Sequence, residues 1–208
     1  MIKKIIKENF IYLIIILLLV LTFSAIMRSS LHDKIILFDK EIIKLVSNNI
    51  NSTLVSIFKI LTRFGGAVIP CIILLILLIF HKNKWITLLQ GCSYGIAGII
   101  TYVSKLLAAR PRPEMAIIKI PSSFSFPSGH TLTSIVFYTI LCYLLAYKNK
   151  NRNIFMICGF VFALLIASSR VYLGVHYFSD VIGGLIIAIP CLLMCINIIN
   201  KNFSNKLK

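Results

Sequence analysis

Hydrophobic residues along the chain gather in six long runs separated by short polar segments. Such runs are typical of membrane-spanning helices, which need ~20 residues to cross ~30 Å of hydrocarbon. The first run follows Lys3, Lys4 and Lys7, as in a signal peptide, but it is long for a signal core, so we favour a retained helix. We expect the second run, the shortest, to extend back through Phe64-Gly65-Gly66. The predicted spans are Asn9 to Met27, Ala67 to Phe80, Trp85 to Leu107, Thr131 to Tyr147, Ile154 to Ser169 and Val181 to Ile199.

The segment between the first two runs, residues 28–66, mixes charged and apolar residues. From Asp39 to Ile50 the apolar residues recur at roughly helical spacing, which predicts an amphipathic helix at the membrane surface. The chain has no internal repeat and no low-complexity linker. We therefore expect one domain over residues 1–208, an all-α integral membrane bundle of six transmembrane helices.

Composition favours the same class, because 59% of residues are hydrophobic and only 13% are charged, which is unusual for a soluble domain. A net charge of +16 would suggest nucleic acid in a soluble protein, but here the cations cluster beside the apolar runs. They are placed to meet anionic membrane lipids, and we expect no nucleic acid partner. The six cysteines form no C-x-x-C or Cys/His cluster and read as small buried hydrophobic residues.

Charge in the short connections predicts the orientation of the bundle. With six spans, the two tails and the turns at 81–84 and 148–153 share one side, which carries eleven cations against the single acid Glu8. The other side also carries eleven cations, but in longer segments and with five acids. The density of lysine and arginine in short loops determines how the spans are oriented in the membrane, so we expect both termini in the cytoplasm.

Four polar clusters then fall together on the extracytoplasmic face. Ionisable groups at the edges of membrane spans are expensive and usually functional. Three of the cations suit an anionic ligand, and the guanidinium groups suit phosphate oxygens in particular. Taken singly, each cation could instead reach towards lipid headgroups. The clusters are Lys105 with Arg112-Pro113, Pro127-Ser128-Gly129-His130, Ser169-Arg170, and His176 with Asp180.

The cluster of residues 127–130 directly precedes the fourth span and predicts a helix start. Ser128 is a suitable cap, and free N–H groups of Ser128 and Gly129 would point at a bound anion with the helix dipole assisting. The alternative is an ordinary capped helix that happens to carry His130.

His176 and Asp180 are four residues apart, so in a helix they share one face. The carboxylate would fix the tautomer of the imidazole and leave the other ring nitrogen as a nucleophile. A metal pair is the rival interpretation, but the nearby cations disfavour it, and we expect no metal and no cofactor.

These clusters together resemble, in order and spacing, the three-part signature of the type 2 phosphatidic acid phosphatase (PAP2) family. Arg110-Pro111 repeats the pair Arg112-Pro113, but only Arg112 keeps the family spacing from Lys105. Arg112 is therefore assigned to the site, and Arg110 is left as a candidate headgroup contact. For the aromatic residues beside the site, Phe124, Phe126, Tyr172 and Tyr177, we favour anchoring in the membrane interface over lining the site.

The resemblance implies a metal-independent lipid phosphatase. His176 would attack phosphorus to give a phosphohistidine while Asp180 holds its other nitrogen, and His130 would protonate the leaving oxygen and later assist water. The phosphate oxygens would be held by Lys105, Arg112, Ser128, Gly129, Ser169 and Arg170.

The expected substrate is a membrane lipid phosphate, and we favour undecaprenyl diphosphate, converted to undecaprenyl phosphate at the outer face of the cell membrane. Phosphatidylglycerophosphate, phosphatidate and lipid A phosphates are alternatives within the same class. A lipid phosphotransferase, or a non-catalytic lipid-binding protein, are alternatives of a different class.

Overall fold

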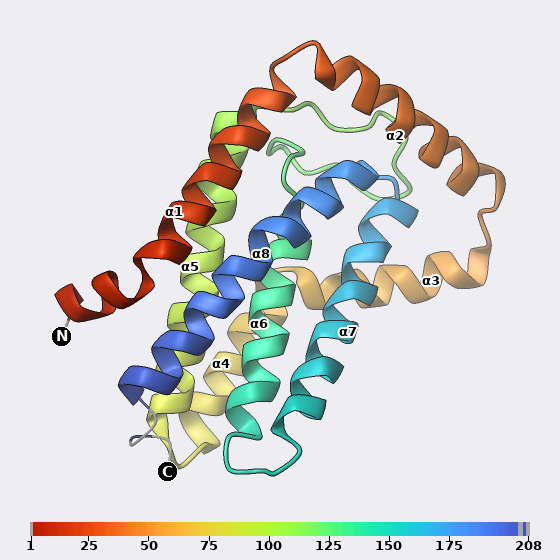
Figure 1. The fold of residues 1–208 in the computed structure, drawn as a ribbon. Coiled ribbons are helices and arrows are strands. Elements are labelled where there is room, and N and C mark those ends of the chain that lie inside the picture. Colours follow the sequence, from red (N-terminus) through yellow and green to blue (C-terminus); the bar gives the residue numbers. More distant parts are fainter. Residues whose placement is uncertain (1, 204–205, 207–208) are drawn as a thin grey trace.

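The computed structural model describes residues 2–203 and 206, a range that contains helices and no strand (Figure 1). Eight α-helices, one 3-10 segment and one π-helical turn follow each other along this range. They are α1 (Ile2–Met27), α2 (Leu31–Asn48), α3 (Ser52–Leu61), η1 (Thr62–Gly65), α4 (Val68–Phe80), α5 (Lys84–Ala108), α6 (Gly129–Leu145), α7 (Arg152–Tyr172), α8 (Phe178–Ile198) and η2 (Ile199–Phe203).

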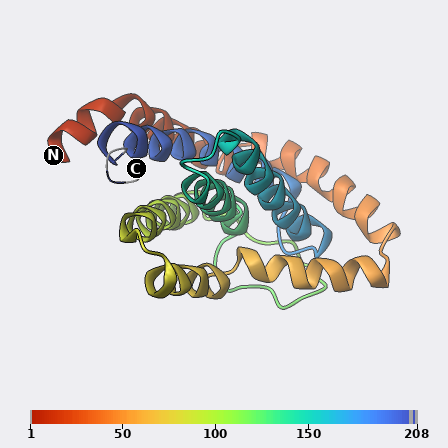
Figure 2. The same ribbon diagram turned by 90° about the horizontal axis from the view of Figure 1, so that it is seen from below.

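Helix α6 lies at the centre of the bundle and contacts α5, α7 and α8 (Figure 2). Most of its residues are buried, which is why its apolar positions form no single stripe. Gly159 of α7 allows α7 to pack closely against α6, since a Cβ there would lie 2.4 Å from the carbonyl oxygen of Tyr138. Helix α1 closes the bundle by packing on α8 and α5.

The six apolar runs all form helices, and four of these are long and apolar enough to cross a membrane: Lys4–Met27, Lys84–Ala108, Arg152–Tyr172 and Phe178–Phe203. Helix α4 reaches that length only together with α3 and η1, and α6, with 17 residues, is shorter. The described helices thus give four to five span candidates. The second run does not extend through Phe64–Gly66 as one continuous helix: residues 62–65 form η1, and the chain bends by 52° between Ser52–Gly65 and Val68–Phe80, which together are long and apolar enough for one broken span.

The lateral surface of the bundle is apolar, as a lipid-facing surface requires. Leucine and isoleucine side chains are exposed on the outer faces of α1, α4 and α7. Cys71, Cys92 and Cys158 are also exposed, so the expectation that all six cysteines are buried is wrong for these three.

The predicted amphipathic helix is present as α2, but it begins at Leu31 and also packs against other helices of the bundle. Ile42 and Val46 pack against a cluster formed by α7 and α8, whereas Leu45 and Ile50 stay exposed. Ile42 and Val46, two residues of the predicted apolar stripe, therefore attach α2 to the bundle.

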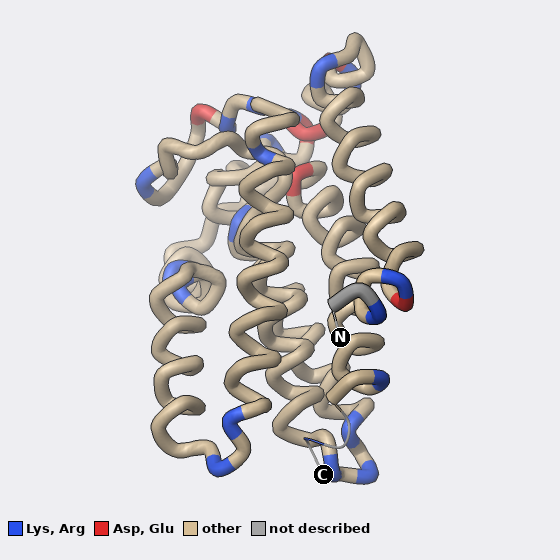
Figure 3. The backbone as a smooth tube through the Cα atoms, turned by 90° about the vertical axis from the view of Figure 1, so that its left-hand side faces the viewer, with Lys and Arg blue, Asp and Glu red and all other residues tan. Residues whose placement is uncertain are grey.

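The connections divide between the two ends of the bundle (Figures 1 and 3). Segment η2 and the turns 81–83 and 146–151 lie at one end, where lysine and arginine residues gather. Helix α2, the long loop 109–128 and the turn 173–177 lie at the other end. Every predicted polar cluster lies on or beside these three segments.

Candidate active site

The loop between α5 and α6 folds over the end of the bundle and fixes two of the predicted cations. Arg112 donates from Nε to the carbonyl of Ser123 at 2.7 Å and from Nη1 to the carbonyl of Val175 at 2.7 Å. Lys105, in the last turn of α5, donates to the carbonyls of Phe124 and Ser125. The two cations are thus positioned by backbone oxygens, and neither forms an ion pair with a carboxylate in the described part of the chain.

His176 lies in the turn between α7 and α8. The turn depends on Gly174, which has a φ of 70° and would, with a Cβ, bring that atom 2.3 Å from the carbonyl oxygen of Met115. The His176 side chain is 2% exposed, and its Nδ1 lies 3.3 Å from Oδ2 of Asp180. The predicted pair is therefore formed, although the histidine precedes the helix and only Asp180 lies within it.

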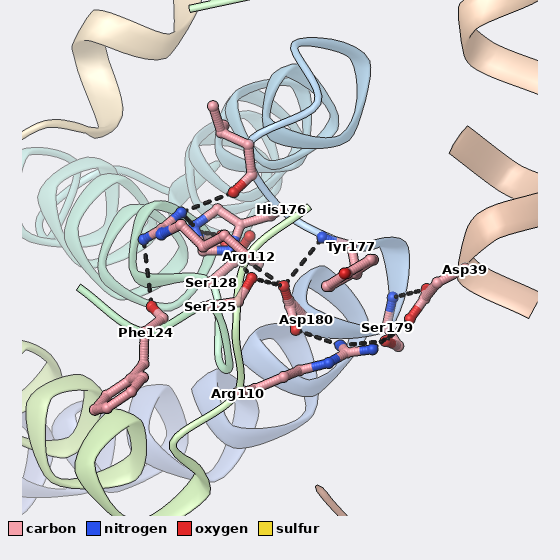
Figure 4. Close-up of polar contacts among 12 residues, drawn as sticks. Asp39, Arg110, Arg112, Phe124, Ser125, Ser128, His176, Tyr177, Ser179 and Asp180 are labelled. Atoms are coloured by element: carbon pink, nitrogen blue, oxygen red, sulfur yellow. Dashed lines mark hydrogen bonds and ion pairs between the residues drawn. The ribbon is translucent and has the colours of Figure 1, made fainter. Parts of the chain in front are cut away.

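The contacts of the imidazole determine its tautomer. Nη1 of Arg112 lies 3.1 Å from Nε2 of His176, and a guanidinium group only donates hydrogen bonds. Nε2 must therefore accept, and the ring proton lies on Nδ1, facing the Asp180 carboxylate (Figure 4). Burial lowers the pKa of His176 to about 4; Asp180 opposes this change, while Arg112 and Lys105 add to it. The ring is consequently neutral near pH 7, with its Nε2 lone pair directed at the cations.

Asp180 is held on both carboxylate oxygens. Its Oδ2 accepts from the backbone N–H of Tyr177 at 3.0 Å and from the hydroxyl of Ser125. Its Oδ1 accepts from Arg110 at 2.5 Å. As the third residue of α8, it also lies at the positive end of the helix dipole. An ionised Asp180 is thus stabilised although the group is fully buried.

The predicted helix start at residues 127–130 is confirmed, with Ser128 as the N-cap of α6. The Ser128 hydroxyl accepts from the N–H of Thr131 at 3.4 Å. The N–H of Ser128, predicted to be free for an anion, instead donates to the carbonyl of Asp180 at 3.0 Å, so this part of the prediction is wrong. The start of α6 is thereby tied to the start of α8. His130 follows on the first turn, with its ring against Gly65 of η1, where a Cβ would lie 2.7 Å from Cδ2 of the ring.

The third cluster, Ser169-Arg170, differs between its two members. The Ser169 hydroxyl is buried and donates to the carbonyl of Ile166 within α7, so it serves its own helix. Arg170 is 3% exposed and donates from Nη1 to the Thr62 hydroxyl. Its Nε is buried and has no hydrogen-bond partner among the described residues, which leaves a donor for an anion.

Arg110 is the main correction to the expected site. Its side chain is completely buried and forms ion pairs with Asp39 and Asp180, and its guanidinium carbon lies 4.2 Å from the centre of the Tyr177 ring. It cannot reach a lipid headgroup.

Two of the aromatic residues were also assigned wrongly. Tyr177 is buried under Arg110, and Phe126 packs against Phe23 and Gly183 inside the protein instead of anchoring it in the interface.

Sequence reasoning missed Ser125 and Asp39, which complete the surroundings of Asp180. Ser125 lies in a serine-rich loop without any spacing that singles it out. Asp39 had one indirect signal: the chain has only six acidic residues against 22 cations, and a buried arginine near the site needs one of them.

Comparison with known proteins assigns the family. The family model described as PAP2 superfamily matches residues 86–204, more than half of the chain. An undecaprenyl-diphosphatase from Sulfolobus acidocaldarius is 32% identical over 83% of this chain and 84% of that protein. The chain therefore belongs to the PAP2 family, and the predictions of a phosphatase and of a multi-pass membrane protein are confirmed.

Other relatives extend this comparison. Phosphatidylglycerophosphatase B of Bacillus subtilis is 33% identical over 62% of this chain, and the match spans 63% of that protein, slightly less than two thirds of its length. The crystal structure of a transmembrane PAP2 type phosphatidylglycerolphosphate phosphatase from Bacillus subtilis has a TM-score of 0.79, with 26% identity over 90% of this chain and 95% of that one. Aquifex aeolicus LpxE has a TM-score of 0.61, with 25% identity over 75% of this chain and 93% of that one.

Proposed function

We propose that this protein hydrolyses undecaprenyl diphosphate to undecaprenyl phosphate through a phosphohistidine on His176. The observation that carries the proposal is the orientation of that imidazole. Asp180 holds the protonated Nδ1 at 3.3 Å, while the Nε2 lone pair points towards Arg112 at 3.1 Å. A neutral, oriented imidazole beside a fixed cation suits nucleophilic attack on an anionic phosphorus centre.

In the proposed reaction, Nε2 of His176 attacks the terminal phosphorus and a P–N bond forms as the bond to the bridging oxygen breaks. His130, on the first turn of α6, gives its proton to that leaving oxygen. Asp180 compensates the positive charge that develops on the His176 ring. Water, deprotonated by His130, then attacks phosphorus, the P–N bond breaks, and inorganic phosphate leaves with His176 restored.

The cations around His176 would hold the phosphate oxygens. Lys105, Arg112 and Arg170 come from three different segments, and the buried Nε of Arg170 is a donor ready for an anion. Arg112 would exchange its contact with Nε2 for a phosphate oxygen when substrate binds. We propose that Ser128, Gly129 and Ser169 support the site through the helices that carry it. Ser128 caps α6 and Gly129 begins it, and Ser169 lies in the last turn of α7 beside Arg170.

The choice of undecaprenyl diphosphate is supported by the relatives. Two of the known proteins similar to this chain are undecaprenyl-diphosphatases, from Sulfolobus acidocaldarius and from Bacillus subtilis, the latter 32% identical over 67% of this chain. Phosphatidylglycerophosphate is the second candidate substrate, supported by the fold shared with the Bacillus subtilis phosphatase at a TM-score of 0.79.

We further propose that all six apolar runs cross the membrane, with both termini in the cytoplasm and the active site on the extracytoplasmic face. In this arrangement α4 completes the bundle beside α5, and α6 is short because its N-terminus lies within the site. The gathering of cations in the turns 81–83 and 146–151 supports a cytoplasmic location for that end.

Phosphate release in detergent tests this function, with a chelator present and with undecaprenyl diphosphate, phosphatidylglycerophosphate, phosphatidate and a lipid A phosphate as substrates. We expect release to be fastest from undecaprenyl diphosphate and to be lost by a factor of about 10⁴ or more in His176→Ala, since a covalent nucleophile is removed. His81→Ala is the matched control, because His81 lies in the turn at the opposite end of the bundle, and it should retain activity.

Other outcomes of the assay have defined meanings. Equal release from wild type and His176→Ala would refute the histidine mechanism, and preference for another lipid would refute the substrate assignment. A phosphorylated alcohol in place of free phosphate would identify a phosphotransferase.

A further inference from the structure

A carboxylate from outside the signature residues lies at the centre of the site's buried polar network. Asp39, on α2, is 0% exposed, although it belongs to a helix whose neighbouring residues Phe38 and Lys40 are exposed. Residue 39 also precedes residues 86–204, the part of the chain that the family model matches. Its burial beside α8 is decided by contacts with Arg110 and Ser179 (Figure 4).

Asp39 caps α8 from another helix. Its Oδ1 accepts from the backbone N–H of Ser179 at 3.0 Å, and its Oδ2 accepts from the Ser179 hydroxyl. Ser179 is the second residue of α8, whose N–H has no partner within the helix. Asp39 thus holds the first turn of α8, the same turn that carries Asp180.

Arg110 connects the two carboxylates. Its Nη2 donates to Asp39 at 2.7 Å, its Nη1 donates to Asp180 at 2.5 Å and to the Ser179 hydroxyl at 2.8 Å, and its Nε donates to Nε2 of His32 at 3.1 Å. Every nitrogen of the guanidinium group therefore has a partner. One buried cation is shared between two buried anions.

The consequence for His176 is electrostatic. With His176 neutral, the buried group of Asp39, Arg110 and Asp180 carries one net negative charge. If Asp39 were absent, Arg110 would neutralise Asp180 alone, and little negative charge would remain to stabilise the cationic imidazole that forms during attack. With Asp39 as its second partner, Arg110 orients Asp180 without cancelling it.

We propose that Asp39 is a positioning residue for the hydrolytic reaction. Through Arg110 and the first turn of α8, it keeps Asp180 oriented towards His176 and keeps the negative charge of Asp180 available to that histidine. This inference rests on the proposed function, in which His176 is the nucleophile. It assigns α2 a role in the chemistry as well as in the architecture.

Asp39→Asn tests the proposal, because asparagine keeps the size of the side chain and one acceptor oxygen for the N–H of Ser179, while it removes the charge and the second oxygen, which accepts from Arg110. We expect kcat to fall by about 10- to 100-fold with KM nearly unchanged, a smaller loss than the ~10⁴-fold expected for removing the carboxylate that itself orients the histidine. Glu41→Gln is the control, since Glu41 lies exposed on the same helix and its replacement should leave kcat unchanged. A change in KM alone, or unchanged kinetics, would overturn the proposal.

A double variant separates charge balance from mere structural support. Asp39→Asn with Arg110→Gln restores the net charge of the buried group, so its kcat should exceed that of Asp39→Asn. If the pair only holds the helices together, Asp39→Asn already breaks that link, and the double variant should be no more active than Asp39→Asn. That result would overturn the proposal, and thermal unfolding of each variant shows whether it is folded.

A measurement without substrate distinguishes failure of this inference from failure of the proposed function. In ¹H–¹⁵N spectra of protein labelled in histidine, the Nδ1–H proton of His176 is identified by its loss in His176→Ala. We expect an upfield displacement of this signal in Asp39→Asn and not in Glu41→Gln, because a less charged Asp180 accepts a weaker hydrogen bond. An unmoved signal would overturn the coupling even if the wild type hydrolyses lipid. Absence of any lipid hydrolysis would refute the proposed function and leave this readout intact.

Discussion

At the scale of single residues, the site combines groups whose charges are set by their neighbours. His176 is buried against cations and kept neutral, while Asp180, equally buried, receives four hydrogen bonds or ion pairs that stabilise its charge. Of these two neighbouring buried residues, His176 is therefore neutral and Asp180 is negatively charged. This difference in charge suits His176 to act as a nucleophile and Asp180 to balance the positive charge that develops on its ring.

The low pKa of His176 predicts the acid side of the pH profile. A nucleophile must be neutral, and burial lowers its pKa from 6.5 to about 4, so kcat/KM should not decline as pH falls through 6.5 and should decline only as pH approaches about 4. The measurement is kcat/KM against pH, with the ionisation of the substrate phosphate followed separately by ³¹P NMR and subtracted. A loss centred near pH 6.5 that the substrate does not explain would contradict the burial of an uncharged His176.

At the scale of elements, the site is assembled where helix ends meet. The N-termini of α6 and α8 are joined by the hydrogen bond from Ser128 to Asp180, and η1 supplies the surface against which His130 lies. The bend between η1 and α4 is therefore important for the site, because it leaves η1 against His130. A straight extension of α4 through Gly65 and Gly66 would carry that surface away from α6.

Gly65→Ala tests the role of η1. A Cβ at this position would lie 2.6 Å from Cγ2 of Ile166 and 2.7 Å from Cδ2 of His130, so the histidine ring must move. We expect kcat to fall by about 10- to 100-fold, because displacing a catalytic group by about 1 Å has an effect of this size. Gly66→Ala is the matched control, since a Cβ there would meet only the carbonyl of Arg63 at 3.4 Å. Equal activity of the two variants would show that His130 tolerates displacement.

At the scale of the whole molecule, the two ends of the bundle differ in kind. One end carries the site, α2 and the long loop, and the other carries short turns rich in lysine and arginine (Figure 3). This asymmetry leads to the proposed orientation, with the site facing outward.

Labelling of introduced cysteines tests that orientation. We expect Lys119→Cys, in the exposed loop beside the site, to react with a membrane-impermeant maleimide in intact cells. Lys150→Cys, in the exposed turn at the opposite end, should react only after the membrane is permeabilised. Both variants are made in a background in which the six native cysteines are replaced by serine. The reverse pattern would place the site in the cytoplasm.

The sequence by itself determined the class of the protein and the segments that carry its polar chemistry. Long apolar runs must form helices in a membrane, because hydrocarbon offers no partner to an open backbone group. Local spacing was also sufficient to predict the pair of His176 and Asp180 and the start of α6 at residues 127–130, because caps and neighbouring turns follow from a few adjacent residues.

Tertiary structure alone decided which other residues complete the site. Asp39 and Arg110 are 71 residues apart, and nothing local distinguishes Asp39 from the other acidic residues around α2. Arg110 was left as a candidate headgroup contact because only Arg112 keeps the family spacing from Lys105, yet it is fully buried. A buried charge is stable only with a partner, and which partner it finds depends on how distant helices pack. The bend at η1 was also not predicted: the chain turns by 52° between Ser52–Gly65 and Val68–Phe80, and Gly65 lies against His130 of α6 and Ile166 of α7, contacts that depend on how these distant helices pack.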